Sequence, residues 1–149
     1  MDDLTKLLIR RSAIKNDDFR KSLPVNALTS EIVAFKAAHK KDTVIKDMKA
    51  FGHQFKFKDR LIGGHLIISP LVFWHDSIWE ILKTVKNYSM FDKDNDPHGE
   101  RIFGDLKIGK ETIFWKFDFY QDSDCKWGCS NHLKNPCWRV LTIYNSKEH

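Results

Sequence analysis

The pattern that most constrains the fold is a strict alternation of side chains over residues 111–121, directly after the dipeptide Gly109-Lys110. Between residues 113 and 119, one face of this segment carries only large apolar residues, namely Ile113, Trp115, Phe117 and Phe119. The opposite face carries a mixed set, namely Phe114, Lys116, Asp118 and Tyr120. A period of two residues predicts a half-buried strand, and a glycine that accepts positive φ predicts a tight turn before it. The segment is therefore expected to form a β-hairpin with residues 101–108.

Helical periodicity dominates the chain before this hairpin. Helices are expected over 3–21, 29–39, 42–51 and 76–86. The first should bury Leu4, Leu7, Leu8, Ile14 and Phe19, and the last should bury Ile78, Ile81, Leu82 and Val85. Further strands are expected over 55–58, 65–69 and 138–144. This order predicts an α+β fold in which N-terminal helices precede an antiparallel sheet with one helix packed on it.

Size and composition favour one globular domain spanning residues 1–149, with 42% hydrophobic and 13% aromatic residues. Residues 1–62 are expected to be helical, and residues 63–149 to hold one helix, the hairpin and a final strand. No segment approaches the roughly 18 uninterrupted apolar residues of a membrane span. The acidic start, followed by Arg10 and Arg11, is unlike a secretory signal and favours a cytoplasmic protein. The chain also lacks the phosphate-binding P-loop, the dinucleotide-binding glycine motif and the nucleophile elbow, which excludes those enzyme classes.

The net charge of +5 is unevenly distributed, because the segment from Lys36 to Arg60 holds eight basic and three acidic residues. Phenylalanines alternate with cations near its end, which makes Lys56, Lys58 and Arg60 candidates for nucleic-acid binding. A solvated lysine-rich surface is the alternative interpretation. The partners that the sequence suggests are therefore protein or nucleic acid, with no membrane contact, and it does not indicate an oligomeric state.

A second candidate site lies in the loop that follows the hairpin. Cys125, Cys129, His132 and Cys137 supply the ligands of a Cys3His zinc site within a short segment. The alternative is that the three cysteines are reduced thiols, since an odd number excludes a complete disulfide framework. No cofactor is expected on that interpretation, and zinc is the one metal that the spacing suggests.

The densest polar cluster is residues 92–100, where four carboxylates and one imidazole precede the hairpin. Its acidic spacing starts like a calcium-binding EF-hand loop, but Pro97 replaces the required glycine and Phe103 the required glutamate. The residues that would carry catalysis are Asp96, His98 and Glu100, with Asp118 in support. The alternative is ordinary turn chemistry, in which short polar side chains bond the local backbone. Glu100 would then form an inter-strand ion pair with Arg139.

Four blocks in this half of the chain resemble a bacterial family known as domain of unknown function 3768. They are residues 94–100, Phe103-Gly104, Phe114-Trp115-Lys116-x-Asp118-x-Tyr120 and residues 139–143. A weaker match lies at Asn16-Asp17-x-Phe19-Arg20. The resemblance spans about residues 63–143 and implies a small intracellular bacterial protein with an accessory role, such as one carried by a mobile element. Asp94, Asn95, Lys116 and Arg139, which lie in or beside these blocks, are candidates for binding.

The chain departs from the family pattern in three places. Ile102 stands where an acidic residue is expected, residues 22–60 resemble an insertion, and the loop over 125–137 carries cysteines in place of acidic and small residues. The resulting expectation is a non-catalytic binding module that engages a protein or nucleic-acid partner. The alternative is a small metal-dependent hydrolase or nuclease centred on Asp96-Pro97-His98-Gly99-Glu100. The first should show a self-bonded turn, and the second should show these side chains converging in a pocket.

Overall fold

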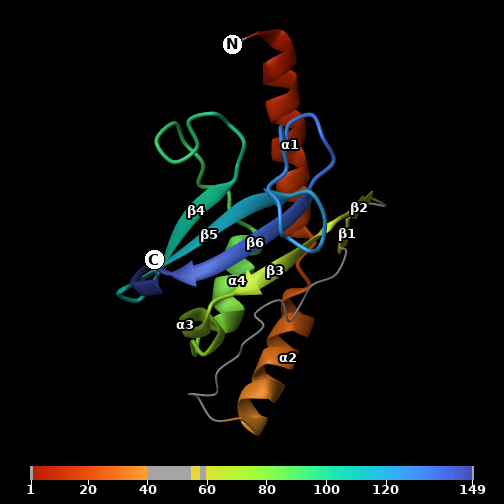
Figure 1. Ribbon diagram of the computed structural model, residues 1–149. Coiled ribbons are helices and arrows are strands. Elements are labelled where there is room, and N and C mark those ends of the chain that lie inside the picture. The colour runs from red at the N-terminus through yellow and green to blue at the C-terminus, as the bar shows by residue number, and fades with distance from the viewer. Residues whose placement is uncertain (1, 40–54, 58–59, 149) are drawn as a thin grey trace.

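The computed structural model describes residues 2–39, 55–57 and 60–148, and of β1 and β2 only the backbone (Figure 1). Its helices are α1 (Asp3–Lys21), α2 (Val25–Ala38), α3 (Pro70–Phe73) and α4 (Ile78–Lys86), with a 3-10 turn over Ser146–Glu148. Its strands are β1 (Phe55–Phe57), β2 (Arg60–Ile62), β3 (Gly64–Ile68), β4 (Phe103–Ile108), β5 (Glu111–Tyr120) and β6 (Trp138–Asn145). The α+β class expected from the sequence, with N-terminal helices before the main sheet, is confirmed.

The main sheet has the strand order β3-β6-β5-β4, and β1 pairs with β2 in a separate two-stranded sheet. The β4–β5 and β5–β6 pairs are antiparallel, as a hairpin and its continuation must be. The β3–β6 pair is parallel, with Leu66 opposite Leu141. The sheet is therefore mixed and mostly antiparallel. The parallel pair arises because the chain leaves β3 through α3 and α4 and returns to pair with β3 only as the last strand.

The main core lies between the sheet and the helices behind it in Figure 1, α1 and α4. The expected stripe of α4 is wholly buried, and on β5 Ile113, Trp115 and Phe117 are buried while Phe119 is partly buried. Gly104 on β4 allows this packing, because a Cβ there would meet the Trp115 ring at 2.5 Å and the Tyr88 ring at 2.7 Å. The hairpin faces and the helix packed on them are thus confirmed.

The stripe expected for α1 is wrong except at Phe19 and, in part, Leu8. Leu4 is 59%, Leu7 54% and Ile14 43% exposed, whereas Ile9 and Ala13 are buried. Figure 1 shows why, since the start of α1 projects beyond the edge of the sheet and only its C-terminal half crosses the fold. Sequence periodicity marks an apolar stripe, but it does not say how far the sheet extends beneath the helix.

Residues 22–62 differ from the sequence expectation in other respects. The second helix begins at Val25, where Pro24 precedes it, and Thr29 donates its hydroxyl to Val25 O at 2.7 Å inside the helix instead of capping its start. The helix expected over 42–51 lies outside the described residues. The segments 55–57 and 60–62 are strands, so the described part of residues 1–62 is not helical throughout.

Candidate functional site

The acidic segment forms a turn whose polar groups bond its own backbone. Asp92 Oδ1 accepts hydrogen bonds from the amides of Asp94 at 2.8 Å and Asn95 at 3.0 Å. Asn95 returns the contact, because its Oδ1 accepts from the Asp92 amide at 2.9 Å and its Nδ2 donates to Met90 O at 2.8 Å. These are the Asx bonds that short polar side chains make in turns. The binding candidates Asp94 and Asn95 therefore belong to a structured turn, and Asp94 contributes its amide.

The second half of the turn is fixed by Asp96. Its Oδ1 accepts from the Arg101 amide at 3.0 Å, while its backbone amide donates to Asp92 O at 2.9 Å. The chain turns sharply here, with positive φ at Gly99 (74°) and at Arg101 (58°). A positive φ is strained for a residue with a side chain, so the Asp96 contact is what holds Arg101 in this conformation.

The catalytic candidates do not converge. His98 is exposed and makes none of the contacts described for Asp96 or Glu100. Glu100 Oε2 contacts His132 Nε2 at 2.8 Å. Asp118 lies on β5, where it pairs with Lys116 Nζ at 3.4 Å, both side chains being more than two-fifths exposed. The arrangement expected of a turn is thus observed, whereas the pocket expected of a hydrolase centred on these four residues is not formed.

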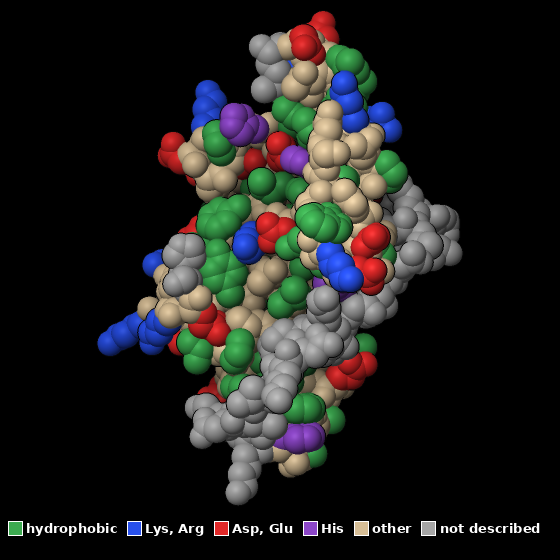
Figure 2. Space-filling view, viewed as in Figure 1, with side chains coloured by type: hydrophobic (Ala, Val, Ile, Leu, Met, Phe, Trp, Pro, Cys, Tyr) green, Lys and Arg blue, Asp and Glu red, His purple; other side chains and the backbone are tan. Residues whose placement is uncertain are grey.

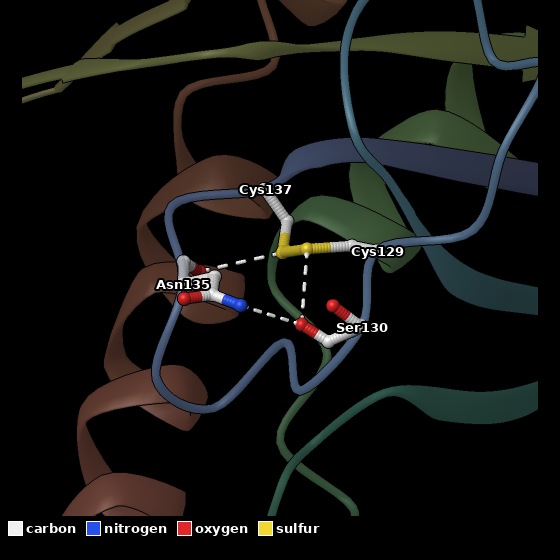
Figure 3. The surroundings of a disulfide bond; sticks show 4 residues. All are labelled: Cys129, Ser130, Asn135 and Cys137. Atoms are coloured by element: carbon white, nitrogen blue, oxygen red, sulfur yellow. Dashed lines mark hydrogen bonds between the residues drawn. A yellow bond between two sulfur atoms is a disulfide. The ribbon is translucent and has the colours of Figure 1, made fainter.

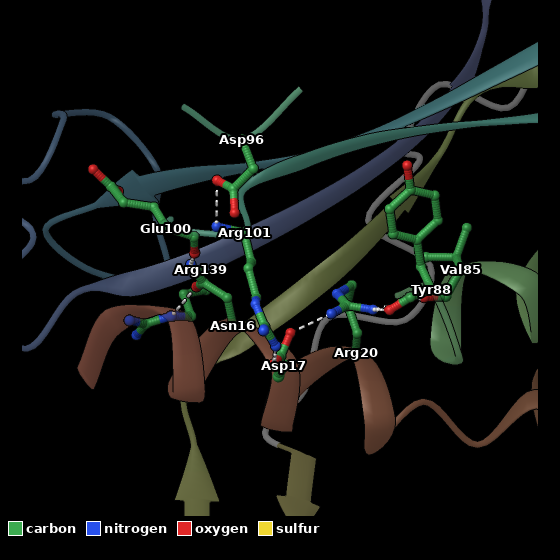
Figure 4. Close-up of polar contacts among 9 residues, drawn as sticks. All are labelled: Asn16, Asp17, Arg20, Val85, Tyr88, Asp96, Glu100, Arg101 and Arg139. Atoms are coloured by element: carbon green, nitrogen blue, oxygen red, sulfur yellow. Dashed lines mark hydrogen bonds and ion pairs between the residues drawn. The ribbon is translucent and has the colours of Figure 1, made fainter. Parts of the chain in front are cut away.

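A polar cluster that helical periodicity did not single out lies beneath the turn, on α1 (Figure 4). Asn16 is fully buried and joins two distant segments, accepting from Arg139 Nε at 2.9 Å and donating to Glu100 O at 3.0 Å. Arg139 is 5% exposed and lies over the Phe119 ring at 5.2 Å. Burial lowers the pKa of Arg139 to about 10. Arg139 donates to Asn16 and the Glu100 carboxylate contacts His132, so the expected ion pair between Arg139 and Glu100 is wrong.

The same face of α1 carries an ion-paired triad. The Asp17 carboxylate contacts Arg20 with one oxygen and Arg101 with the other (Figure 4). Arg20 also donates to Val85 O at 3.1 Å and Tyr88 O at 3.0 Å, carbonyls at the C-terminal end of α4. Burial lowers the pKa of the Arg20 guanidinium, and the adjacent Asp17 carboxylate opposes that shift. The triad therefore fixes α1 to both the turn and α4.

One signal in the sequence pointed to these residues. The weaker family match, Asn16-Asp17-x-Phe19-Arg20, contains the three polar residues that α1 contributes to the cluster, together with the fully buried Phe19. Helical periodicity alone could not find them, because it ranks apolar residues as buried and polar residues as exposed.

The four residues of the expected zinc site have separate partners. Cys129 and Cys137 form a disulfide with a Cα–Cα distance of 6.0 Å, which closes a short loop (Figure 3). Cys125 Sγ lies 3.9 Å from His65 Nε2, and His132 stacks on Phe119 with ring centroids 4.3 Å apart. Among the described residues no group of three or more His, Cys, Asp or Glu side chains is arranged to hold a metal ion. The expectation that all three cysteines are thiols is not met, because two of them are joined.

The basic segment can be followed only in part. Lys58 lies outside the described residues, as do the side chains of Lys56 and Arg60. Lys36 donates to His75 O at 3.0 Å and so ties α2 to the loop between α3 and α4. Burial lowers the pKa of the Lys36 ammonium group. Lys36, the first cation of the basic segment, is therefore engaged in a contact within the protein.

A groove of about 420 Å³ separates α1 from the end of the turn, residues 97–101. Its floor is apolar and consists of Ile9, Ala13 and Ile14, and its walls carry Lys6 and Arg10 on α1 and His98 and Arg101 on the turn. Asp17 is the carboxylate that lines it, and the two arginines already neutralise that group. Figure 2 shows the turn and the start of α1 as two projections at the top of the molecule. The groove is therefore basic above an apolar floor.

Two further apolar side chains, Leu4 and Leu7, are exposed on the N-terminal half of α1. Leu4 and Leu7 lie toward the projecting end of the helix, and Ile14, which is 43% exposed, lies on the groove floor. Arg11 and Lys15 are exposed on the same helix. Burial and the nearby Arg139 and Arg11 lower the pKa of Lys15. We call the surface formed by the groove and these two leucines the α1 surface.

Within the described residues, none of the helices has the length and apolarity needed to cross a bilayer.

Comparisons with known proteins identify a family for this chain. No curated protein and no solved structure matches the chain. A family model described as "Protein of unknown function (DUF3768)" matches residues 72–148, just over half of the chain. The match begins in α3 and runs past Ile143, so it starts later and ends later than the resemblance suggested. On this match the chain belongs to the family described as Protein of unknown function (DUF3768).

Proposed function

We propose that the protein is a non-catalytic binding module that holds an acidic segment of a partner protein on the α1 surface. The observation that carries this proposal is the groove, where Lys6, Arg10 and Arg101 surround a floor of apolar side chains. Complementary charge steers a partner and sets its register, while apolar contact supplies most of the affinity.

The charge of the groove favours an anionic occupant. Asp17 cannot offset the surrounding cations, because both of its oxygens already contact arginines. Arg101 is 46% exposed in its side chain although it contacts Asp17, so part of its guanidinium faces solvent. A carboxylate-bearing segment would therefore meet uncompensated positive charge on both walls.

The apolar part of the surface favours a protein segment over a bare polyanion. Leu4 and Leu7, on the helix that lines one side of the groove, are more than half exposed, and exposed large apolar side chains near a groove are typical of a docking site. An amphipathic segment that lies along a helix buries such residues at helical spacing. Acidic residues on its flank would then face Lys6 and Arg10.

The turn supports a binding role. Asp96 and Glu100 are occupied by Arg101 and His132, and His98 is left on the groove wall. No observation on the described residues favours the alternative, a metal-dependent hydrolase or nuclease. Such an enzyme needs a converging set of ligands or a nucleophile beside its base.

The direct test is binding of a fluorescein-labelled peptide in which Leu residues follow helical spacing and Glu residues fill the other positions. Fluorescence anisotropy should show saturable binding, and the same peptide with Lys in place of Glu should not bind. The variant Lys6→Ala with Arg10→Ala should weaken binding at least about tenfold, which corresponds to ~1.4 kcal/mol. Lys21→Ala is the matched control, because Lys21 is an exposed cation of α1 that does not line the groove. Equal binding of both peptides would contradict the proposal.

We also propose that the protein is a cytoplasmic bacterial protein with an accessory role on a mobile element. The Cys129–Cys137 disulfide provides a test of the location, because disulfides persist in oxidising compartments and are reduced in the cytosol. Cells lysed in an alkylating reagent should then yield protein with all three cysteines alkylated. Protection of Cys129 and Cys137 from the reagent would place the protein in an oxidising compartment.

A further inference from the structure

The outer face of the main sheet, which points away from α1 and α4, is rich in aromatic side chains. The alternation of β5 puts Phe114 and Tyr120 on this face, opposite the buried Trp115. The antiparallel register then places Tyr144 opposite Phe114, and Trp138 opposite Tyr120. Phe103 on β4 belongs to the same face, because its cross-strand neighbour is Lys116. We call this surface the outer sheet face.

Three of these rings form a row across three strands. The centroids of Phe103 and Phe114 are 5.5 Å apart with their planes inclined by 29°, and those of Phe114 and Tyr144 are 5.5 Å apart with an inclination of 39°. All three side chains are half-buried, so each keeps part of its surface in contact with solvent. Figure 2 shows hydrophobic side chains gathered over β4 and β5 on the face toward the viewer.

Lysines surround the row. Lys116 lies beside Phe103 in the register, and Lys107 is held on the same face by donating to Thr112 Oγ1 at 2.9 Å. Lys110 at the hairpin turn and Lys147 after β6 are exposed near the same end of the sheet. Two carboxylates share the face. Asp105 lies opposite Phe114 in the register, and Asp118 lies within 3.4 Å of Lys116. The charge around the rings is therefore mixed, with more cations than carboxylates.

We propose that the outer sheet face binds single-stranded nucleic acid, with bases stacked on Phe103, Phe114 and Tyr144 and phosphates beside Lys107 and Lys116. Aromatic rings on the open face of a four-stranded sheet bind unpaired bases because every base has a π-face. The nearby lysines contact the phosphates without sequence preference. The surface is separate from the α1 surface, so this binding does not depend on the proposed protein partner.

The experiment compares three ligands of about 12 nucleotides, a length within the range that one such surface covers. They are a fluorescein-labelled single strand, the same strand annealed to its complement, and a strand of equal length in which the central nucleotides are abasic. Anisotropy should show that the single strand binds at least tenfold more tightly than either of the others. Equal binding of the abasic strand would overturn the proposal, because it would show that charge alone accounts for the contact.

Variants of the row test the assignment to these residues. Phe114→Leu and Tyr144→Leu keep apolar volume and remove the ring, and each should weaken binding roughly 5- to 100-fold. Trp79→Leu is the matched control, since Trp79 is a 43% exposed aromatic residue on α4, away from the outer sheet face. With two phosphate contacts, the slope of log affinity against log salt should be roughly −1.4. Wild-type affinity in both ring variants, with unchanged circular dichroism, would also overturn the proposal.

Discussion

The acidic turn over residues 92–101 and the polar cluster of α1 use similar side chains in opposite ways. In the turn, Asp92, Asn95 and Asp96 bond groups between two and five residues away in the sequence. In the cluster, Asn16 reaches Glu100 and Arg139 across 84 and 123 residues, and Arg20 reaches Val85 across 65. One region closes on itself, whereas the other connects distant parts of the fold.

Solvent exposure determines what each region contributes to stability. A polar group in an exposed turn exchanges its partner for water when the contact is lost, so the change in free energy is small. A buried group has no such substitute, and losing one partner leaves the other desolvated and unpaired. A dense polar cluster in a sequence therefore need not be the part of the structure that depends most on its polar contacts.

The largest effect should come from removing Arg20, which is 1% exposed and contacts Asp17 and two carbonyl groups of the α4 end. Arg20→Ala should lower the free energy of unfolding by about 3–5 kcal/mol, because three buried acceptors lose a cation. Urea denaturation measures it, with Lys21→Ala as an exposed neighbour expected to change stability by at most ~0.5 kcal/mol. Similar losses of unfolding free energy in the two variants would show that burial does not make these polar contacts more important for stability.

A covalent link should rank second. The Cys129–Cys137 disulfide closes a loop with a sequence separation of 8, and His132 inside it contacts Glu100 next to the turn. Cys129→Ser with Cys137→Ser should lower the free energy of unfolding by about 2–3 kcal/mol through the entropy of the unfolded chain. Adding a dithiol reductant to the wild type should reproduce the shift. No change in either experiment would mean that the His132–Glu100 contact and the loop's own bonds already hold it.

The turn itself should be nearly neutral for stability. His98→Ala with Glu100→Gln removes an exposed ring and keeps an acceptor for His132, so the free energy of unfolding should change by less than about 1 kcal/mol. The circular dichroism spectrum should stay close to that of the wild type, while binding of the acidic peptide weakens. Asp94→Asn, which keeps the amide bonded to Asp92, is the control for binding. An unfolded double variant would show that the turn is as structural as the α1 cluster.

The smallest effect concerns a partly buried pair beside the hairpin turn, His75 and Glu111. Ser77 N donates to His75 Nδ1 at 2.9 Å, so His75 Nε2 carries a proton and donates to Glu111 at 2.5 Å. This bond holds the pKa of Glu111 below its usual value of 4.5. A carboxyl group with a lowered folded pKa stabilises the fold above its unfolded pKa, and this contribution disappears as pH falls through the folded pKa.

The Tm of the wild type should therefore exceed that of Glu111→Gln by a constant small margin above about pH 5, and the margin should shrink below about pH 4.5. Thermal melts in dilute buffer from pH 6 to pH 3 measure it. A margin that grows on acidification would mean that Glu111 is destabilising in its charged form.

The sequence predicted the acidic turn of the candidate site. It did not predict the groove between that turn and α1. The turn was predictable, because Asx bonds need only residues close in the chain. The groove was not, because Lys6 and Arg10 belong to α1 and His98 and Arg101 to the turn. The zinc expectation depended on spacing alone, and spacing does not show that Cys129 would meet Cys137 while His132 turns to Glu100.

Local periodicity by itself determined the hairpin faces, the α4 stripe and the order of helices and strands, since a period of two or 3.6 residues is a property of neighbouring residues. Only the tertiary structure decided the parallel pairing of β3 with β6, the exposure of Leu4 and Leu7, and the burial of Asn16 and Arg20. These depend on which distant segments meet. A buried polar residue is tolerated only where a partner from elsewhere in the chain arrives to bond it.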